Sequence, residues 1–191
     1  MRILRAMDHK AMPWKNGGGV TREVASAPAL NESSPFVWRL SLATIRQSGP
    51  FSLFPGIDRT IAALRGDPVR LTIDGKEVAQ LHALGEPFAF SGDAKVSAFT
   101  DGAETIDLNI MTLRGHAHHD MTRLDWAGET TIKTWHRLTM LVFTSAVRIS
   151  SDAHAFEADV DDVIVDIPSE TRLSLSSSGP AVAYVIGVDE H

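Results

Sequence analysis

Short apolar segments, each ended by glycine, proline, aspartate or serine, constrain the fold of this chain more than any other feature. Val69–Ile73 and Thr105–Leu113 are two of them, and a turn residue follows each closely. Regularly spaced short segments of β-branched and aromatic residues are typical of β-sandwiches and β-barrels. No segment makes a convincing long helix. The sequence therefore predicts an all-β protein.

The strand pattern can be placed residue by residue. We expect strands at residues 2–6, 20–26, 36–45, 59–65, 69–73, 77–81, 87–90, 95–100, 105–113, 130–135, 138–144, 147–150, 163–167, 171–175 and 181–188. Asp74-Gly75 between two of them predicts a tight hairpin turn. Residues 116–125, rich in histidine and aspartate, are expected to form a crossover.

A weak internal repeat runs through the pattern. Residues 69–73 resemble residues 147–150, and residues 88–97 resemble residues 164–173. The two matches have a spacing of roughly 77 residues, longer than a solenoid repeat and closer to half a domain. Two such halves suit a double-sheet jelly roll. We expect one domain built of two β-lobes, at roughly residues 1–115 and 116–191.

Charge and cysteine content exclude several function classes. The 191 residues carry a formal charge of -6, so no overall basic field attracts nucleic acid or an anionic membrane. The chain contains no cysteine, which excludes a disulfide framework and thiolate chemistry. No apolar run reaches the ~20 residues that span a membrane, and the first residues lack a signal-peptide core. We expect a cytoplasmic protein.

Polar side chains interrupt the apolar faces of several predicted strands. Successive strand residues point to opposite faces. Arg39 and Ser41 therefore share a face with apolar neighbours, and Thr21 and Glu23 share one with Ala25. Asp107 and Asn109 lie on the face of Met111 and Leu113, and Arg59 begins a strand after the aromatic loop of Phe51 and Phe54.

These positions have three interpretations. They face solvent, or Arg39 and Asp107 form a buried ion pair that only fixes register. Alternatively, several of them converge on one pocket with the residues around the triple glycine. That pocket would use the cations Lys15, Arg39 and Arg59, the neutral groups Asn16, Thr21, Ser41 and Asn109, and the carboxylates Glu23 and Asp107. Because a guanidinium binds a carboxylate bidentately, the expected ligand is a small anionic metabolite.

The glycine loop and the histidine cluster are two further candidate motifs. Residues 16–19, Asn-Gly-Gly-Gly, lack the phosphate-loop pattern and precede a predicted strand rather than a helix. We expect backbone clearance at a barrel mouth, with Asn16 and the amides of Gly17 and Gly18 against the ligand and Trp14 as a candidate wall. His116 and His118 are spaced to chelate a metal on a strand, with Asp120 or His154 as a third ligand. A solvated histidine-rich loop is the favoured interpretation, and no metal site is predicted.

Several motifs together resemble the HutD/Ves family of small bacterial proteins. They are Trp14-Lys15-Asn16-Gly17-Gly18-Gly19-x-Thr21-x-Glu23, Trp38-Arg39-x-Ser41-x-Ala43, Gly49-Pro50-Phe51-Ser52-x-Phe54-Pro55-Gly56-x-Asp58-Arg59, Phe90-Ser91-Gly92-Asp93 and Asp107-Leu108-Asn109-x-Met111. The match covers roughly the whole chain, with its specific motifs before residue 115.

The resemblance implies a cupin-like (RmlC-like) jelly-roll barrel in a two-lobed bicupin arrangement. It also implies a link to histidine utilisation, through binding of an intermediate such as formylglutamate or urocanate as a governor of flux. No cofactor is implied, and a homodimer is compatible with it. The resemblance carries over Lys15, Asn16, Thr21, Glu23, Arg39, Ser41, Arg59, Asp107 and Asn109.

The sequence is also compatible with two further functions. A cupin barrel also hosts enzymes, either metal-dependent oxygenases or metal-free isomerases, and for an activity without metal Lys15 or Glu23 is the candidate base. A third alternative is an interaction protein that docks through the loop of Phe51 and Phe54.

Overall fold

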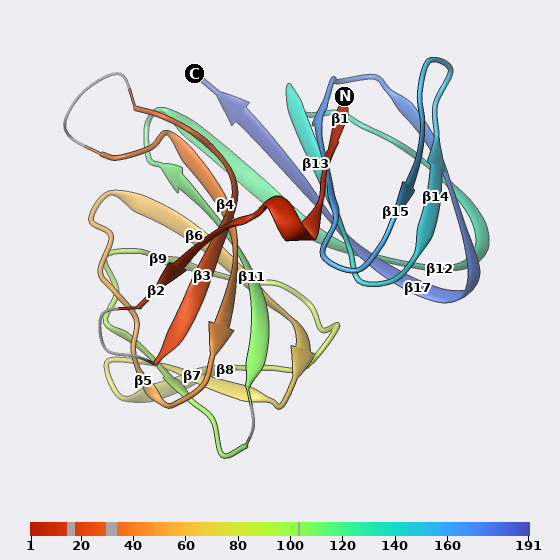
Figure 1. Cartoon of the computed structure of the whole chain (residues 1–191). Coiled ribbons are helices and arrows are strands. Elements are labelled where there is room, and N and C mark those ends of the chain that lie inside the picture. Colours follow the sequence, from red (N-terminus) through yellow and green to blue (C-terminus); the bar gives the residue numbers. More distant parts are fainter. Residues whose placement is uncertain (15–17, 30–33, 103) are drawn as a thin grey trace. The chain divides into compact units, whose positions relative to one another are not determined.

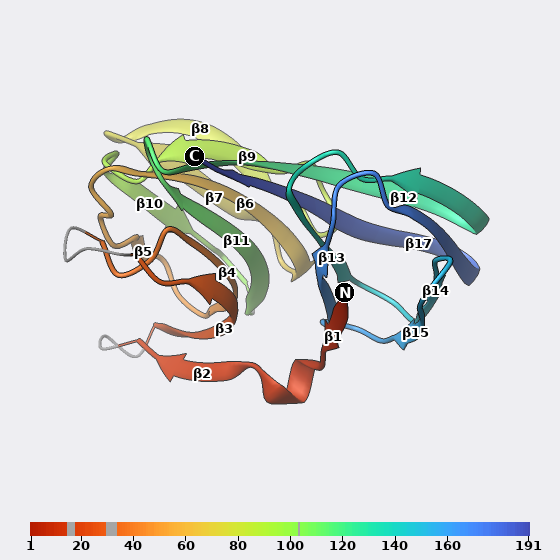
Figure 2. The same cartoon turned by 90° about the horizontal axis from the view of Figure 1, so that it is seen from above.

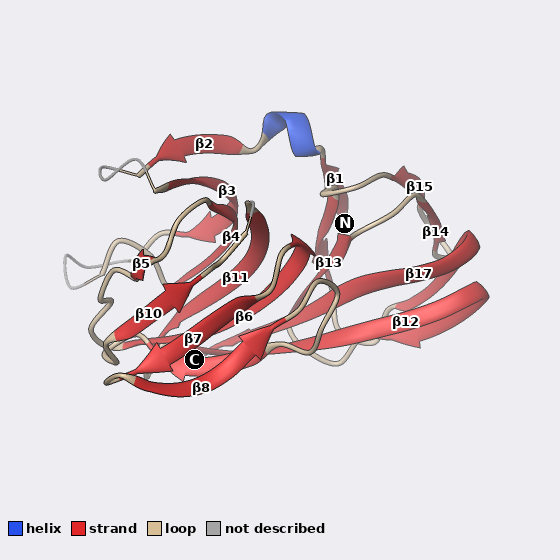
Figure 3. Cartoon of the chain, turned by 90° about the horizontal axis from the view of Figure 1, so that it is seen from below, coloured by secondary structure: helices blue, strands red, loops and turns tan. Residues whose placement is uncertain are grey.

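The computed structural model describes residues 1–14, 18–29, 34–102 and 104–191. Strands and loops make up nearly all of this part of the chain, and its one helix is a short 3-10 turn at Ala6–Asp8 (Figure 3). The all-β prediction is confirmed. The chain forms two compact units, one of Lys10–His118 with His191 and one of Met1–His9 with His119–Glu190.

The Lys10–His118 unit contains two sheets. The larger has the strand order β2-β3-β4-β11-β6-β9, and the smaller has the order β5-β10-β7-β8. Figure 1 shows β4, β11 and β6 running side by side. Their bounds are β2 Lys10–Pro13, β3 Gly19–Ala27, β4 Trp38–Ile45, β5 Gly49–Pro50, β6 Ile57–Gly66, β7 Val69–Ile73, β8 Lys76–Leu81, β9 Phe88–Ser91, β10 Val96–Phe99 and β11 Thr105–Leu113.

Alternation of apolar residues explains the core of this unit. Ile61 on β6, Leu71 on β7 and Phe90 on β9 pack into one buried cluster. Full burial of such a side chain contributes about 1.5–3 kcal/mol. The predicted hairpin turn is confirmed, because Asp74 and Gly75 have φ angles of 50° and 78°, as a primed turn requires.

The second unit has one sheet in the order β1-β16-β13-β17-β14-β15, with β12 also paired to β17. Figure 2 shows the two long strands β12 and β17 running alongside each other. Residues 1–9, which the sequence analysis placed in the first lobe, belong to this unit because β1 pairs with β16. The bounds are β1 Arg2–Leu4, β12 Ala117–Lys133, β13 Leu138–Phe143, β14 Val147–Ser150, β15 Ala155–Ala158, β16 Val163–Ile167 and β17 Arg172–Glu190.

The predicted repeat corresponds to strands with equivalent partners. β7 pairs with β8 and β10, and β14 pairs with β15 and β17. Likewise β9 pairs with β6, and β16 pairs with β13. These strands therefore have equivalent pairing in the two units, while the bicupin description itself stays a prediction.

The structure differs from the predicted strands at three places. The expected crossover at residues 116–125 is the first part of β12, whose buried Ala117 and Met121 alternate with exposed polar residues. The strands expected at residues 171–175 and 181–188 are one strand, β17, which pairs first with β14 and then with β13. The short strands β2, β5 and β15 were not predicted.

Candidate functional site

A cavity of about 700 Å³ lies on the six-stranded sheet of the Lys10–His118 unit. Ligand-binding cavities in proteins usually have volumes of ~300–1,000 Å³. Its lining includes six residues that the sequence analysis marked on strand faces: Thr21, Arg39, Ser41, Arg59, Asp107 and Asn109. The structure therefore brings these six side chains to one cavity, and their contact with a ligand stays a prediction.

The register of three neighbouring strands arranges these side chains in rows. β11 lies between β4 and β6, so that Met111 is opposite Arg39 on one side and Arg59 on the other. Two residues along β11, Asn109 is opposite Ser41. Two residues further, Asp107 lies between Ala43 and Ala63. A row of guanidinium groups, a neutral row and a carboxyl row thus follow one another across the cavity.

Aromatic rings hold both guanidinium groups. The Arg39 Cζ atom lies 4.8 Å from the ring centroid of Phe36 and 5.4 Å from that of Phe54. The Arg59 Cζ atom lies 4.7 Å from the Phe90 centroid and 5.4 Å from each of the Phe51 and Phe54 centroids. A cation over an aromatic face is attracted by the ring quadrupole. Phe54 contacts both arginines and so fixes their relative position.

Neither guanidinium has a carboxylate within ion-pair distance among the described residues. Arg39 Nη2 donates to Met111 Sδ at 3.4 Å, and Arg59 Nη1 donates to the Ser52 carbonyl at 3.5 Å. The Nε atoms of both residues are buried without a partner. Burial lowers the pKa of Arg39, and it lowers the pKa of Arg59 to about 10.

The pKa of Asp107 shifts in the opposite direction to the pKa values of the two arginines. Its side chain is 2% exposed. Burial raises the pKa of Asp107 to about 7, although the nearby positive charge of Arg59 favours the ionised form. The Oδ1 atom of neighbouring Asn109 is buried without a partner. The cavity therefore holds strong donors at one end and acceptors at the other.

Trp14 forms part of the cavity wall, as expected. Its Nε1–H donates to Thr21 Oγ1 over 2.8 Å. Gly19 allows this approach, because a Cβ atom there would lie 2.1 Å from the Thr44 carbonyl oxygen and 3.1 Å from the Trp14 ring.

Not every predicted residue lines the cavity. Gly18 and Glu23 are outside its lining, and Glu23 instead accepts a hydrogen bond from Ser26 Oγ at 3.2 Å. The negative charge of Glu23 still opposes the lowering of the Arg39 pKa. A β-bulge between Glu23 and Ala25 places Ala25 opposite Leu40, so the expected face shared by Glu23 and Ala25 is wrong. Lys15, Asn16 and Gly17 lie outside the described residues.

The sequence analysis missed the aromatic part of the site. Phe51 and Phe54 were considered only as a docking loop, yet both line the cavity and face Arg59. Leu53 is the exposed large apolar side chain of this loop. The density of phenylalanine just before Arg59 was the available signal.

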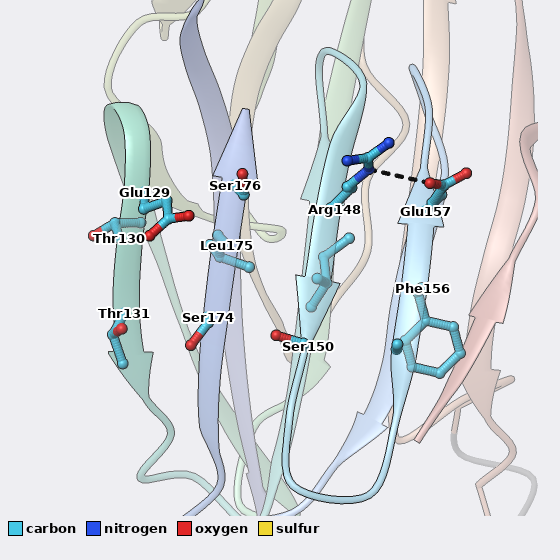
Figure 4. Close-up of a pocket in the computed structure, with 12 residues that line it drawn as sticks. Glu129, Thr130, Thr131, Arg148, Ser150, Phe156, Glu157, Ser174, Leu175 and Ser176 are labelled. Atoms are coloured by element: carbon cyan, nitrogen blue, oxygen red, sulfur yellow. Dashed lines mark hydrogen bonds and ion pairs between the residues drawn. The ribbon is translucent and has the colours of Figure 1, made fainter. Parts of the chain in front are cut away.

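A second hollow, of about 460 Å³, lies in the unit of Met1–His9 and His119–Glu190. Figure 4 shows its lining on the neighbouring strands β12, β17, β14 and β15, with Arg148 already bonded to Glu157. This Nε–Oε1 contact of 3.1 Å is exposed to solvent. None of the residues that line this second hollow has a buried polar side-chain atom without a hydrogen-bond partner. The cavity beside Arg39 and Arg59 is therefore the stronger candidate.

The histidine cluster lies on β12 and at its start. His118 Nδ1 is 3.2 Å from His191 Nε2, and the two rings stack. Within the described ranges, no group of three histidine, aspartate or glutamate side chains is placed to hold a metal ion. In the same part of the chain, no helix has the length and apolar character needed to cross a membrane.

Distant structures share this fold. A cupin 2 conserved barrel protein from Leptotrichia buccalis superposes with a TM-score of 0.61 at 10% identity, covering 94% of this chain and 96% of that one. The cupin-like barrel prediction is thereby confirmed at the level of fold.

More similar proteins identify the family. An uncharacterised 21.2 kDa protein from the hutC 3′ region of Pseudomonas putida is 37% identical over 151 residues, which are 78% of this chain and 76% of the relative. Protein Ves of Citrobacter koseri is 43% identical over 113 residues, 56% of each chain. HutD from Pseudomonas fluorescens SBW25, solved in a formate condition, superposes with a TM-score of 0.83 at 28% identity, covering 100% of this chain and 98% of that one. The HutD family model matches residues 6–183, and the chain therefore belongs to the HutD family.

Proposed function

We propose that this protein binds a small carboxylate in the cavity beside Arg39 and Arg59, without a metal ion. The observation that carries the proposal is the pair of unsatisfied Nε atoms on two guanidinium groups that have no carboxylate partner among the described residues. Burying a charge without a partner is costly. A ligand carboxylate would remove that cost, because its two oxygens accept from guanidinium N–H groups.

The ligand we propose is an intermediate of histidine degradation such as formylglutamate or urocanate. The P. putida relative comes from the hutC 3′ region, and the HutD structure of P. fluorescens was determined in a formate condition. Binding such an intermediate would let the protein act as a governor of flux through histidine utilisation. The aromatic rings around the guanidinium groups suit a ligand with an apolar body.

A thermal-shift titration tests the binding proposal. Formylglutamate, urocanate, glutamate and formate are added separately to the wild-type protein. A ligand at 100 times its dissociation constant stabilises the native state by about 2.7 kcal/mol, which raises the midpoint of unfolding. We expect formylglutamate or urocanate to give this shift.

Two arginine variants decide where the ligand binds. Arg39→Ala should lose the shift. Arg148→Ala should keep it, because that side chain is exposed, forms a surface ion pair with Glu157 and is not among the residues that line the cavity. The proposal fails if no carboxylate raises the midpoint, or if Arg39→Ala responds as the wild type does.

A further inference from the structure

The cavity beside Arg39 and Arg59 also encloses a carboxyl group of the protein itself. Asp107 lines this cavity and is buried. Resting on the proposed function, we infer that a carboxylate ligand enters the cavity together with a proton, which Asp107 takes up. Occupancy of the cavity therefore responds to pH near neutrality as well as to the concentration of ligand.

Arg59 connects the position of the ligand with Asp107. Its guanidinium group is one of the two that the proposed ligand contacts, and its positive charge acts on the Asp107 carboxyl. That attraction favours the ionised form of Asp107. A ligand carboxylate beside Arg59 offsets the same positive charge, so the attraction between Arg59 and Asp107 becomes less effective.

The ligand also brings a second negative charge into an enclosed space. The cavity has a volume of about 700 Å³, and Arg39 and Arg59 are the only cations among its described lining residues. When two carboxylates share a buried site, the pKa of one of them is raised, because like charges repel each other. Salt screens buried charges less than exposed ones. Both effects of the ligand therefore favour protonation of Asp107.

The residues next to Asp107 in the sheet carry no titratable group. Ala43 of β4 and Ala63 of β6 lie opposite Asp107 on its two neighbouring strands. Asn109, two residues along β11, lines the same cavity and is neutral. A proton that enters with the ligand is therefore not shared with a neighbour of Asp107 in these rows.

The charged groups that share the cavity with Asp107 are Arg59 from β6 and Arg39 from β4. Glu23 on β3 is outside the cavity lining, and its charge acts on Arg39. The pKa of Arg59 is about 10, so this side chain keeps its charge near neutral pH. Asp107 is therefore the group of the described cavity lining that changes charge in this range.

The pH dependence of ligand affinity has a defined sign. Without ligand, burial raises the pKa of Asp107 to about 7, so the carboxyl is partly ionised at neutral pH. A ligand that raises this pKa further binds with uptake of a proton. Linkage is reciprocal, so the same ligand binds more tightly where Asp107 is already protonated. Affinity therefore falls as pH rises through neutrality.

Calorimetric titration in two buffers measures the proton directly. Formylglutamate and formate are the probes, because their carboxyl groups stay ionised above about pH 5.5. The difference in binding enthalpy between HEPES and Tris, divided by the difference in their ionisation enthalpies, gives the number of protons taken up. We expect roughly half a proton per bound ligand at about pH 7.5. Affinity should fall several-fold between about pH 6 and about pH 8.5.

Two variants and one spectroscopic measurement assign the proton to Asp107. Asp107→Asn should bind without proton uptake and with an affinity that does not change with pH. Asp101→Asn should keep the uptake of the wild type, because the Asp101 side chain is 91% exposed and outside the cavity lining. Carbon-13 NMR of the wild-type protein needs no substitution. The aspartate carboxyl signal that titrates near neutral pH should shift its midpoint to higher pH when formylglutamate is bound.

Three results would overturn the inference. The first is binding of formylglutamate or formate to the wild-type protein without proton uptake at about pH 7.5. The second is an Asp107→Asn variant that takes up as many protons as the wild type. The third is a carboxyl titration midpoint that the ligand leaves unchanged. Failure of both acids to bind the wild-type protein would instead contradict the proposed function.

Discussion

Arg59 and Asp107 face the same cavity from the neighbouring strands β6 and β11, and burial brings their pKa values closer together. The pKa of Arg59 falls to about 10 and that of Asp107 rises to about 7. Their mutual attraction reduces both shifts without cancelling either of them. Without ligand, the cavity therefore holds a cation that burial disfavours and a carboxyl group that is partly protonated near neutral pH.

This relationship predicts that the protein loses stability as pH rises toward neutrality. The carboxyl of Asp107 has a pKa near 3.8 when unfolded and about 7 when folded. Between these values the native state binds more protons than the unfolded state, so the free energy of unfolding decreases as pH increases. The stabilisation that the raised pKa of Asp107 gives the native state is complete below the unfolded pKa and is lost as pH passes through about 7. Its size is ~1.4 kcal/mol for each unit by which the folded and unfolded pKa values differ.

Urea denaturation of the wild type and of Asp107→Asn, between about pH 5 and about pH 8, measures this contribution. The variant should gain stability relative to the wild type by a few kcal/mol at the upper pH, because it removes a buried charge. Asp101→Asn is the matched control, since the Asp101 side chain is 91% exposed. Parallel pH profiles for the wild type and Asp107→Asn would show that Asp107 does not titrate in this range.

Phe54 is expected to position the guanidinium groups rather than only to fill space. Its ring lies 5.4 Å from the Cζ atoms of both Arg39 and Arg59. Phe54→Leu keeps an apolar side chain but removes the aromatic face. We expect carboxylate affinity to fall roughly three- to tenfold, since partly desolvated cation–π contacts contribute about 1 kcal/mol.

Calorimetry on the Phe54→Leu variant measures that loss. The control is Phe99→Leu, because Phe99 is 40% exposed and is not among the residues that line the cavity. Its ring centroid lies 5.8 Å from the Cζ atom of Arg70. The Phe99→Leu variant should bind carboxylates with the same affinity as the wild type. Equal affinity in both variants would restrict Phe54 to a packing role.

The strands that the sequence predicts well have a clear apolar alternation and nearby turn residues on both sides. β11 and β7 have the predicted bounds. The first part of β12 was missed because its exposed face carries His118 and Asp120, which conceal the buried alternation of Ala117 and Met121. Tertiary pairing with β17 overrides the loop-like composition of that segment.

The strand part of the candidate site follows from sequence, and the loop part does not. Arg39 and Asp107 were identifiable because a charged residue on an otherwise apolar strand face needs an explanation. The positions of Phe36 and Phe54 depend on how their loops pack, which no local period encodes. The bulge at Glu23 also ends the alternation on which a face assignment rests.

Gly19 should be irreplaceable at the start of β3, where it lies against the Thr44 carbonyl and the ring of Trp14. A Cβ atom there would lie 2.1 Å from the Thr44 carbonyl oxygen, a backbone atom of β4 that cannot move without disturbing the sheet. We expect Gly19→Ala to lower the free energy of unfolding by at least about 1–3 kcal/mol, the usual cost of overpacking. Near-UV circular dichroism should change as well, because the same Cβ would press on the Trp14 ring, 3.1 Å away.

Gly49→Ala is the control, since an added Cβ there meets no atom within 4 Å, and its stability should stay within ~0.5 kcal/mol of the wild type. Equal stabilities of the two variants in urea would mean that β3 and β4 are less closely packed at Gly19 than this geometry requires.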